Sequence, residues 1–452
     1  MVDFSLTMPS PSREAAFDIL LRVEQEQSYA SELLHSDRLD KLSPQDRNLC
    51  TELVMGTLRW RSRLDLAIAA DSSQPMNKLD PEVLTALRLG AYQIGFLRLP
   101  ARAAVNESVE LVKRARRRYS VSFVNAVLRK LAAKPDLIEP RLSLGPKTAV
   151  DLAELYAHPR WVVERWASRY GLEAAEKICA FDQQVPETAL RLRDPAAEEE
   201  LHREGIELKP GVLLGSARRV VKGDVTHTAA FRDKRVAIQD EASQLVALLV
   251  GSGERLLDCC AAPGGKTAMI AERNPQAEII ATDIHPHRAA LLQERLATMP
   301  NVTVIAADAT GLPVWGGFDR VLADVPCSGT GTLARNPEIK WMLTTDDLAE
   351  LQARQAAILA AVMTHVRRRG RLVYSTCSLE SEENAQVIEE ALQSQSEFRV
   401  MNCRSELERL LDSRELAWLD IASLLDGPYL RTISGVHPCD GFFAAILENV
   451  GH

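Results

Sequence analysis

The sequence predicts a protein of several domains. An all-α domain is expected over residues 1–140, a small α+β domain over 141–237, and an α/β domain over 238–452 with a mostly parallel, Rossmann-like sheet of seven strands. A chain of 452 residues suits about three domains of roughly 150 residues each. Its first part has apolar residues at helical spacing. Its last part alternates helical stretches with short runs that are apolar on both faces, which is typical of buried parallel strands.

The composition is that of an ordinary soluble protein, with 46% hydrophobic and 26% charged residues. The N-terminus does not resemble a signal peptide, and no stretch approaches the roughly 20 apolar residues that cross a bilayer. We therefore expect a cytoplasmic monomer without a membrane contact. The eight cysteines form no C-x-x-C pair and no Cys/His cluster of zinc-ligand spacing, so we expect no metal site.

The net charge of −8 hides an uneven distribution. Residues 1–141 hold 21 Lys+Arg against 18 Asp+Glu, and the remainder holds 33 against 44. The basic residues of the first part concentrate at Lys113, Arg114, Arg116, Arg117 and Arg118, with others at Arg98, Arg102, Arg129 and Lys130. Such a patch can neutralise the phosphates of RNA. Alternatively, these residues form an ordinary solvent-exposed helix face without a binding role.

Helices are expected throughout the first domain. Ser12 is a candidate N-cap for a helix that carries Ile19 and Val23, and Ser43 followed by Pro44 starts another. Further helical stretches run over 81–96, 103–116 and 121–133.

Prolines and glycines then break this pattern, at Pro135, Pro140, Gly145 and Pro146. A helix opens near Pro159 and ends at Gly171. Between Thr188 and Val236 short apolar runs alternate with Gly and Pro, which indicates a small α+β unit.

After Ser243 strands and helices alternate. Seven apolar runs are expected as strands, at 255–260, 278–284, 302–307, 318–325, 371–375, 398–401 and 442–447. Thr344 or Thr345 can cap the helix that precedes the fifth strand. The arginines 367–369 suit its C-terminal dipole, and Gly370 follows them.

A glycine-rich turn follows the first of these strands, with the sequence Cys260-Ala261-Ala262-Pro263-Gly264-Gly265-Lys266-Thr267. Such a turn lets a ligand approach the backbone closely and meet a helix N-terminus. Cys260 stands where a P-loop needs its first glycine, and the G-x-G-x-x-G dinucleotide fingerprint is absent. The remaining candidate ligand is a nucleoside-type cofactor.

Two acidic residues fit such a cofactor. Asp283 ends the second strand, where a carboxylate can accept hydrogen bonds from both ribose hydroxyls. Asp308 ends the third strand, placed to accept from an adenine amino group. A single Asp at a strand end is as often a turn or helix cap. Two of them beside a glycine loop make S-adenosylmethionine the leading candidate.

Two cysteines follow the next strands. Cys327 comes shortly after Asp324 at the end of the fourth strand, and Cys377 ends the fifth. Adjacent parallel strands end side by side, so both thiols and Asp324 should line one pocket that faces the cofactor. A free Cys is usually an inert core residue, which remains the interpretation of Cys50, Cys179, Cys259, Cys403 and Cys439.

Methylation of carbon 5 of a pyrimidine explains why two thiols would be needed. C5 becomes nucleophilic once a thiolate has added to C6, and a second group must assist loss of the C5 proton before the first thiol is eliminated. Asp324 could donate a proton to cytosine N3, provided that burial raises its pKa.

The segments that carry this chemistry are 260–267, Asp283, Asp308, 324–331, 336–341, 376–378, Glu383-Asn384 and 440–443. Together they resemble the motifs of the Sun-type RNA cytosine-C5 methyltransferases. Residues 238–243 and the basic helical N-terminus resemble the ribosomal-RNA branch of that family, whose members carry a domain similar to NusB.

The resemblance implies a class I methyltransferase domain that uses S-adenosylmethionine and methylates C5 of a cytosine in 16S ribosomal RNA, of the type at cytosine 967. Cys377 would be the nucleophile, Cys327 would serve product release, and Asp324 would contact the base. The cofactor would be held by Cys260, Ala261, Ala262, Pro263, Gly264, Gly265, Lys266, Asp283, Asp308 and Asp324. The RNA would be bound free or early in ribosome assembly.

Two alternatives stay open. The chain could methylate transfer RNA by the same chemistry, or it could be an RNA-binding assembly factor without catalytic activity. Loss of activity usually removes the nucleophile or the glycine loop, and both are present here. Residues 411–438 match the family least and are given no role.

Overall fold

The computed structural model describes residues 9–36, 39–97, 99–138, 146–314 and 316–451. Within it the chain forms two compact units, Met1–Val185 with Leu333–Met342, and Pro186–Thr332 with Leu343–His452. The boundary expected between residues 140 and 141 lies outside the described residues, as does Arg98, and the division into three domains stays a prediction.

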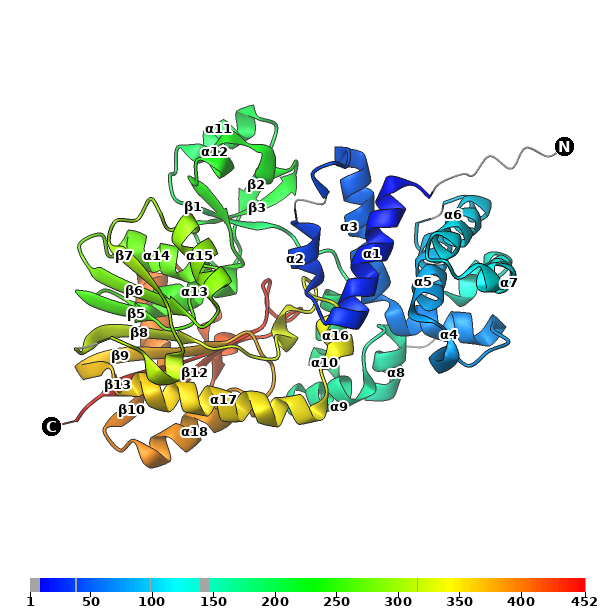
Figure 1. Ribbon diagram of the computed structural model, residues 1–452. Coiled ribbons are helices and arrows are strands. Elements are labelled where there is room, and N and C mark those ends of the chain that lie inside the picture. Colours follow the sequence, from blue (N-terminus) through cyan, green and yellow to red (C-terminus); the bar gives the residue numbers. More distant parts are fainter. Residues whose placement is uncertain (1–8, 37–38, 98, 139–145, 315, 452) are drawn as a thin grey trace. The chain divides into compact units, whose positions relative to one another are not determined.

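The first unit is helical, as predicted for the N-terminal part. Its α-helices are α1 (Pro11–Glu26), α2 (Ala30–Leu34), α3 (Pro44–Arg59), α4 (Arg61–Asp71), α5 (Pro81–Gly95), α6 (Ala101–Arg114), α7 (Val121–Ala132), α8 (Ala149–Leu155), α9 (Arg160–Tyr170), α10 (Leu172–Asp182) and α16 (Ile339–Met342) (Figure 1). Ser43 caps α3 by accepting a hydrogen bond from the Asp46 N–H at 3.1 Å. The expected cap at Ser12 is wrong, because Pro11 takes the first helical position and leaves Ser12 buried inside the first turn.

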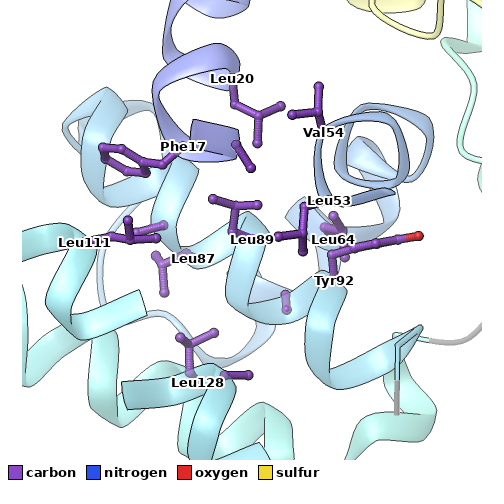
Figure 2. Close-up of a cluster of buried hydrophobic side chains, with 14 of the residues drawn as sticks. Phe17, Leu20, Leu53, Val54, Leu64, Leu87, Leu89, Tyr92, Leu111 and Leu128 are labelled. Atoms are coloured by element: carbon purple, nitrogen blue, oxygen red, sulfur yellow. The ribbon is translucent and has the colours of Figure 1, made fainter. Parts of the chain in front are cut away.

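Helix α5 forms the centre of this unit, since almost all of its residues from Val83 onward are buried. Figure 2 shows Leu87 and Leu89 of α5 among side chains from the surrounding helices. These include Phe17 and Leu20 of α1, Leu53 of α3, Leu64 of α4, Leu111 of α6 and Leu128 of α7. The 3-to-4 spacing of apolar residues in each helix therefore builds a single core.

Residues 333–342 also belong to this unit, although residues 186–332, which precede them in the sequence, belong to the second unit. The Arg59 guanidinium donates to the Ala334 carbonyl at 3.0 Å, and the Trp341 indole N–H donates to the Leu58 carbonyl at 2.7 Å. The Ala30 N–H donates to the buried Glu338 carboxylate at 2.9 Å. These bonds make the short segment an integral part of the helical unit.

The second unit contains two sheets. The smaller is antiparallel, with the order β2-β3-β1-β4, and the larger has the order β11-β12-β13-β9-β8-β5-β6-β7, with β10 beside β13. Their strands are β1 (Ala189–Leu192), β2 (Glu207–Pro210), β3 (Ala217–Lys222), β4 (Val236–Ile238), β5 (Arg255–Asp258), β6 (Glu278–Asp283), β7 (Val302–Ala306), β8 (Phe318–Asp324), β9 (Val366–Thr376), β10 (Phe398–Met401), β11 (Leu425–Asp426), β12 (Tyr429–Thr432) and β13 (Phe442–Asn449).

Five neighbouring strands run parallel to one another, in the order β7, β6, β5, β8 and β9. Beyond β9, each strand runs antiparallel to the strand beside it. All seven expected strands are present. Residues 411–438, which received no role, contribute the short strands β11 and β12 to the edge beyond β13. The arginines 367–369 were wrongly expected at a helix end. Helix α17 (Thr345–Met363) stops before them and β9 has already begun at Val366.

Both faces of the large sheet are covered by helices. Leu256 and Val373 pack in one core with α13 (Glu241–Val250), α14 (Gly265–Arg273) and α19 (Cys403–Asp412). Their sequence neighbours Leu257 and Leu372 pack in the other with α17 and α18 (Ala385–Ser394). Successive strand residues face opposite sides, so burial on both faces explains the continuous apolar runs. Other elements of this unit are α11 (Ala197–Arg203), α12 (Ala229–Arg232) and α15 (Pro286–Arg295).

Candidate active site

The glycine-rich loop connects β5 to α14. Gly264 is the N-cap of α14 with φ +99°, and a Cβ there would lie 2.7 Å from Cδ1 of Leu292. Both observations call for glycine. The Ala262–Pro263 peptide bond is cis. The Ala261 N–H donates to the Thr282 carbonyl at 2.8 Å, which ties the loop to the end of β6. The loop backbone therefore leads directly from the end of β5 into the N-terminus of α14.

The two predicted acidic residues lie at the ends of the next strands. Asp283 ends β6 and accepts a hydrogen bond from the His285 N–H at 2.9 Å. Asp308 follows β7 and accepts from the Thr310 N–H at 2.9 Å, and this hydrogen bond lowers the pKa of Asp308. Both residues therefore cap turns, as a strand-end Asp often does. The sheet order β5-β6-β7 nonetheless places them successively beside the glycine loop.

Asp258, the last residue of β5, was not singled out from the sequence. It is buried and accepts a hydrogen bond from the Thr267 hydroxyl at 2.7 Å, across the glycine loop. Burial raises the pKa of Asp258 to about 7. Its position immediately before the loop was a signal that could have identified it.

Lys266 forms an ion pair that joins the glycine loop to the end of β8. Its ammonium lies 2.7 Å from Oδ2 of Asp324, and Oδ1 of Asp324 accepts from the Ser375 hydroxyl at 2.7 Å. The ammonium also lies 5.0 Å from the ring centre of Phe442. Burial lowers the pKa of Lys266, but the charge and hydrogen bond of Asp324 together with the nearby Cys377 and Asp258 outweigh burial, and the pKa lies above its usual value. From the sequence, Lys266 was expected only as a residue of the cofactor-binding loop.

The two predicted cysteines meet. Their sulfurs lie 3.4 Å apart, and both side chains are half-buried. Cys327 follows β8 and Cys377 follows β9, and these strands are parallel neighbours, as the sequence predicted. The hydrogen bond with Cys377, together with burial, holds the pKa of the Cys327 thiol well above its usual range. Either sulfur can donate the hydrogen bond between them.

The basic run of the helical unit is largely neutralised by its own neighbours. Lys113 pairs with Glu110 at 2.6 Å, Arg114 with Glu14 and Asp18 at 2.6 and 2.8 Å, and Arg117 with Glu82 at 3.1 Å. Arg116 and Arg118 are exposed, and no ion pair involves them among the residues that the structure describes.

The described helices include none with the length and apolar character of a membrane span. The same part of the chain contains no group of three or more His, Cys, Asp or Glu side chains that could hold a metal ion.

A mainly parallel sheet with this loop, these acidic strand ends and these thiols defines a methyltransferase of the S-adenosylmethionine-dependent class. Residues 245–448 match the family described as 16S rRNA methyltransferase RsmB/F, and residues 10–133 match the NusB family. The chain belongs to the RsmB/F family, because several curated members align with most of its length.

Two such relatives illustrate the match. The "Probable ribosomal RNA small subunit methyltransferase B" of Bacillus subtilis is 37% identical over 85% of this chain and 89% of its own. The "Ribosomal RNA small subunit methyltransferase B" of Pasteurella multocida is 33% identical over 97% of this chain and 96% of its own.

Solved structures share the fold. A protein named PH0851 superposes with a TM-score of 0.74, at 22% identity, over 98% of this chain and 100% of its own. NSun6 from Pyrococcus horikoshii, solved with SFG, gives a TM-score of 0.56 at 20% identity over 66% of this chain and 100% of its own.

Proposed function

We propose that this protein transfers a methyl group from S-adenosylmethionine to C5 of a cytosine in 16S ribosomal RNA, of the type at cytosine 967, through a covalent adduct between Cys377 and C6. The contact of 3.4 Å between the two thiols is the observation that carries the proposal. The chemistry needs one sulfur to attack and a second group close by to assist release. Two parallel strands place both at one edge of the sheet.

Attack by Cys377 is favoured by its neighbours. Cys377 attacks as a thiolate in the proposed reaction. Cys327 lies within hydrogen-bond distance to donate to that sulfur, and the Lys266 ammonium interacts electrostatically with it. Addition forms the bond between sulfur and C6, and C5 then accepts the methyl group. The C5 proton then passes to solvent, the C5–C6 double bond forms again and the bond from C6 to Cys377 breaks. Cys327 assists this release by donating its proton to the departing sulfur. Asp324 contacts the base.

S-adenosylmethionine supplies the methyl group. The residues proposed to hold it are Cys260, Ala261, Ala262, Pro263, Gly264, Gly265, Lys266, Asp283, Asp308 and Asp324. The left-handed backbone at Gly264 and the helix N-terminus behind it support this assignment. NSun6, which shares the fold, was solved with SFG, an analogue of S-adenosylmethionine.

The RNA is proposed to be 16S ribosomal RNA, free or early in assembly, because the relatives are named as small-subunit rRNA methyltransferases. Transfer RNA is the second candidate substrate. The target cytosine must leave its stack to admit a thiol above the ring, so a loop or unpaired base is expected. Bisulfite mapping of RNA from cells with and without this chain distinguishes the two substrates.

The adduct provides the test of the thiol roles. Cys377→Ala is expected to abolish methyl transfer while leaving S-adenosylmethionine binding nearly unchanged, and Cys327→Ala should accumulate a covalent protein–RNA adduct on a denaturing gel. An adduct that appears only with Cys377→Ala would exchange the two roles. Wild-type protein that binds RNA but never methylates it would instead favour a silent assembly factor.

A further inference from the structure

A buried polar cluster lies directly behind the two thiols, centred on the carboxylate of Glu383. Glu383 is fully buried, and Gln355, which α17 contributes to the cluster, is fully buried as well. The other members are Ser328 and Ser378, the residues that immediately follow Cys327 and Cys377. Nothing in the proposed chemistry requires a buried carboxylate at this place.

Glu383 accepts four hydrogen bonds. Oε1 accepts from the Ser328 N–H at 2.7 Å and from the Gln355 amide at 2.9 Å. Oε2 accepts from the Ser328 hydroxyl at 2.5 Å and from the Ser378 hydroxyl. A backbone N–H and an amide NH₂ can only donate, so Oε1 is held as an acceptor. Glu383 forms no ion pair with Lys, Arg or His in the described parts of the chain, and the four hydrogen bonds hold its carboxyl group in place.

The cluster extends to the other sides of both cysteines. The Gln355 amide also donates to the Pro326 carbonyl at 2.9 Å, just before Cys327. On the β9 side, the Asn384 amide donates to the Ser378 carbonyl at 2.9 Å and accepts from the Thr376 hydroxyl at 2.5 Å. The residues that flank each thiol are therefore held by Glu383 or by a direct neighbour of it.

A cysteine side chain has a single rotatable bond before its sulfur, so the loop backbone decides where the sulfur lies. Glu383 connects the two loops through Ser328 and Ser378, whose hydroxyl oxygens lie 3.1 Å apart. A separation of 3.4 Å between sulfurs therefore depends on this shared acceptor. Loss of the acceptor would leave buried donors unpaired, and the two loops would move to find new partners.

We propose that Glu383 is a positioning residue that holds the loops of Cys327 and Cys377 in register, so that the two sulfurs stay in contact. The proposal rests on the proposed function for its significance, but the geometry it describes can be measured without any methyl transfer. The negative charge of Glu383 has a second consequence. After the hydrogen bond with Cys377 and burial, it contributes to the raised pKa of Cys327.

The test compares Glu383→Gln with wild type in the full-length protein. The substitution keeps the size of the side chain but removes the shared acceptor of the two hydroxyls, because an NH₂ group facing Ser328 and Ser378 forces both hydroxyls to turn and accept instead of donate. The contact between the thiols is measured with dibromobimane, a short reagent that becomes strongly fluorescent when both of its arms have alkylated thiols. Because a misplacement of about 1 Å can cost roughly 100-fold in rate, we expect bridging and methyl transfer each to fall by about 10–100-fold. Binding of S-adenosylmethionine should stay near wild type.

Three controls make the result specific. Cys377→Ala gives the background from other thiols, including Cys259 and Cys260, whose sulfurs lie 4.0 Å apart. Glu390→Gln changes an exposed glutamate on α18 and should leave bridging and activity unchanged. Ser378→Ala removes one of the four donors and leaves the carboxylate, so a smaller fall is expected. If Glu383→Gln does not fold, bridging in Ser378→Ala tests the proposal instead.

The pH dependence of alkylation is a readout that a purely structural role would not move. In Glu383→Gln, alkylation of Cys327 by iodoacetamide should shift to lower pH, because a negative charge near the thiol has been removed. Unchanged bridging in folded Glu383→Gln overturns the proposal, whatever happens to activity. Bridging that depends on Glu383 in a wild-type protein without methyl transfer would uphold the positioning role and contradict the proposed function instead.

Discussion

Asp324 accepts two hydrogen bonds from neighbouring side chains. The Lys266 ammonium donates to one carboxyl oxygen and the Ser375 hydroxyl donates to the other. The sequence suggested Asp324 as a proton donor to cytosine N3, but both of its carboxyl oxygens already act as acceptors. Asp324 therefore holds the Lys266 ammonium in place.

Asp324→Asn tests this arrangement. The change leaves the half-buried Lys266 ammonium without its counter-charge, so the pKa of Lys266 should fall and methyl transfer should drop by about 100-fold or more. Single-turnover methylation measures the loss. Asp346→Asn, at an exposed position on α17, is the control and should have no effect. Activity near wild type in Asp324→Asn would remove the ion pair from the mechanism.

At the scale of residues, the sequence predicted where the site residues lie at the strand ends better than which of their side chains contact one another. The contact between Cys327 and Cys377 was predictable because adjacent parallel strands end at the same edge of the sheet. The pair between Lys266 and Asp324 was missed because ion pairs between distant residues leave no periodic signal. Glu383 was noted only within a motif, and its role depends on hydrogen bonds that spacing does not reveal.

Among the elements, the loop after β8 is held by a close approach of two backbones. The Gly331 N–H donates to the Cys377 carbonyl at 2.9 Å, and the Gly441 N–H donates to the Gly331 carbonyl at 2.7 Å. A Cβ at Gly331 would come close enough to overlap the carbonyl of Gly441, and backbone cannot move aside as a flexible side chain can.

Gly331→Ala should therefore displace the Cys327 loop. We expect at least about a 10-fold loss of methyl transfer and of dibromobimane bridging, with a lower melting temperature. The matched control is Gly311→Ala, because a Cβ at Gly311 meets nothing within 4 Å. Equal bridging in both variants would show that the loop tolerates the clash.

The segment 333–342 of the helical unit contains a buried lysine, Lys340. Lys340 donates to the carbonyls of Arg59 at 2.9 Å and Ala157 at 3.2 Å. Burial lowers the pKa of Lys340 from 10.5 to about 7; the charge of Arg59 acts in the same direction and Asp182 acts against it. Between these two values the unfolded chain binds a proton that the folded protein does not, so stability should rise with pH across this window.

Urea unfolding at pH 7 and pH 9 measures this effect. Two pH units correspond to at most roughly 2–3 kcal/mol of added stability from Lys340. Lys340→Met should lose this increase, whereas Lys134→Met, at an exposed position, should keep it. Equal pH dependence in all three proteins would contradict the shifted pKa of Lys340.

Elements with strong periodicity were predicted well, and those shaped by tertiary pairing were not. The buried strands β5 to β9 were recognisable from runs that are apolar on both faces. Strand β12 is short and exists because it pairs with β13, and the still shorter β11 pairs with β12. The arginines 367–369 suited a helix end by charge, but pairing with β8 determines that β9 begins at Val366.

On the scale of the whole molecule, the acidic protein offers RNA only a small number of unpaired cations in the basic run. Arg116→Ala with Arg118→Ala should weaken RNA binding and reduce the salt dependence of log K by about 0.7–0.9 for each phosphate that is no longer neutralised. Arg114→Ala with Arg117→Ala is the control, since these side chains already have acidic partners. Equal salt slopes in the two double variants would exclude this run from RNA binding.

The two compact units were only partly predictable. The helical character of the N-terminal part follows from its periodicity. The inclusion of residues 333–342 does not, because Glu338, Lys340 and Trp341 find their partners on helices encoded some 200 to 300 positions earlier, as the Ala30–Glu338 separation of 308 illustrates.

Because residues 333–342 are part of the helical unit, that unit cannot be completed during synthesis until they have been made. Met342 is added 157 residues after Val185 (342 minus 185), which at roughly 5–20 residues per second means a delay of about 8–30 s. Until then the Ala30 N–H and the Leu58 carbonyl have no partner from 333–342. The first unit to leave the ribosome is thus completed only after the loop that carries Cys327 has been made.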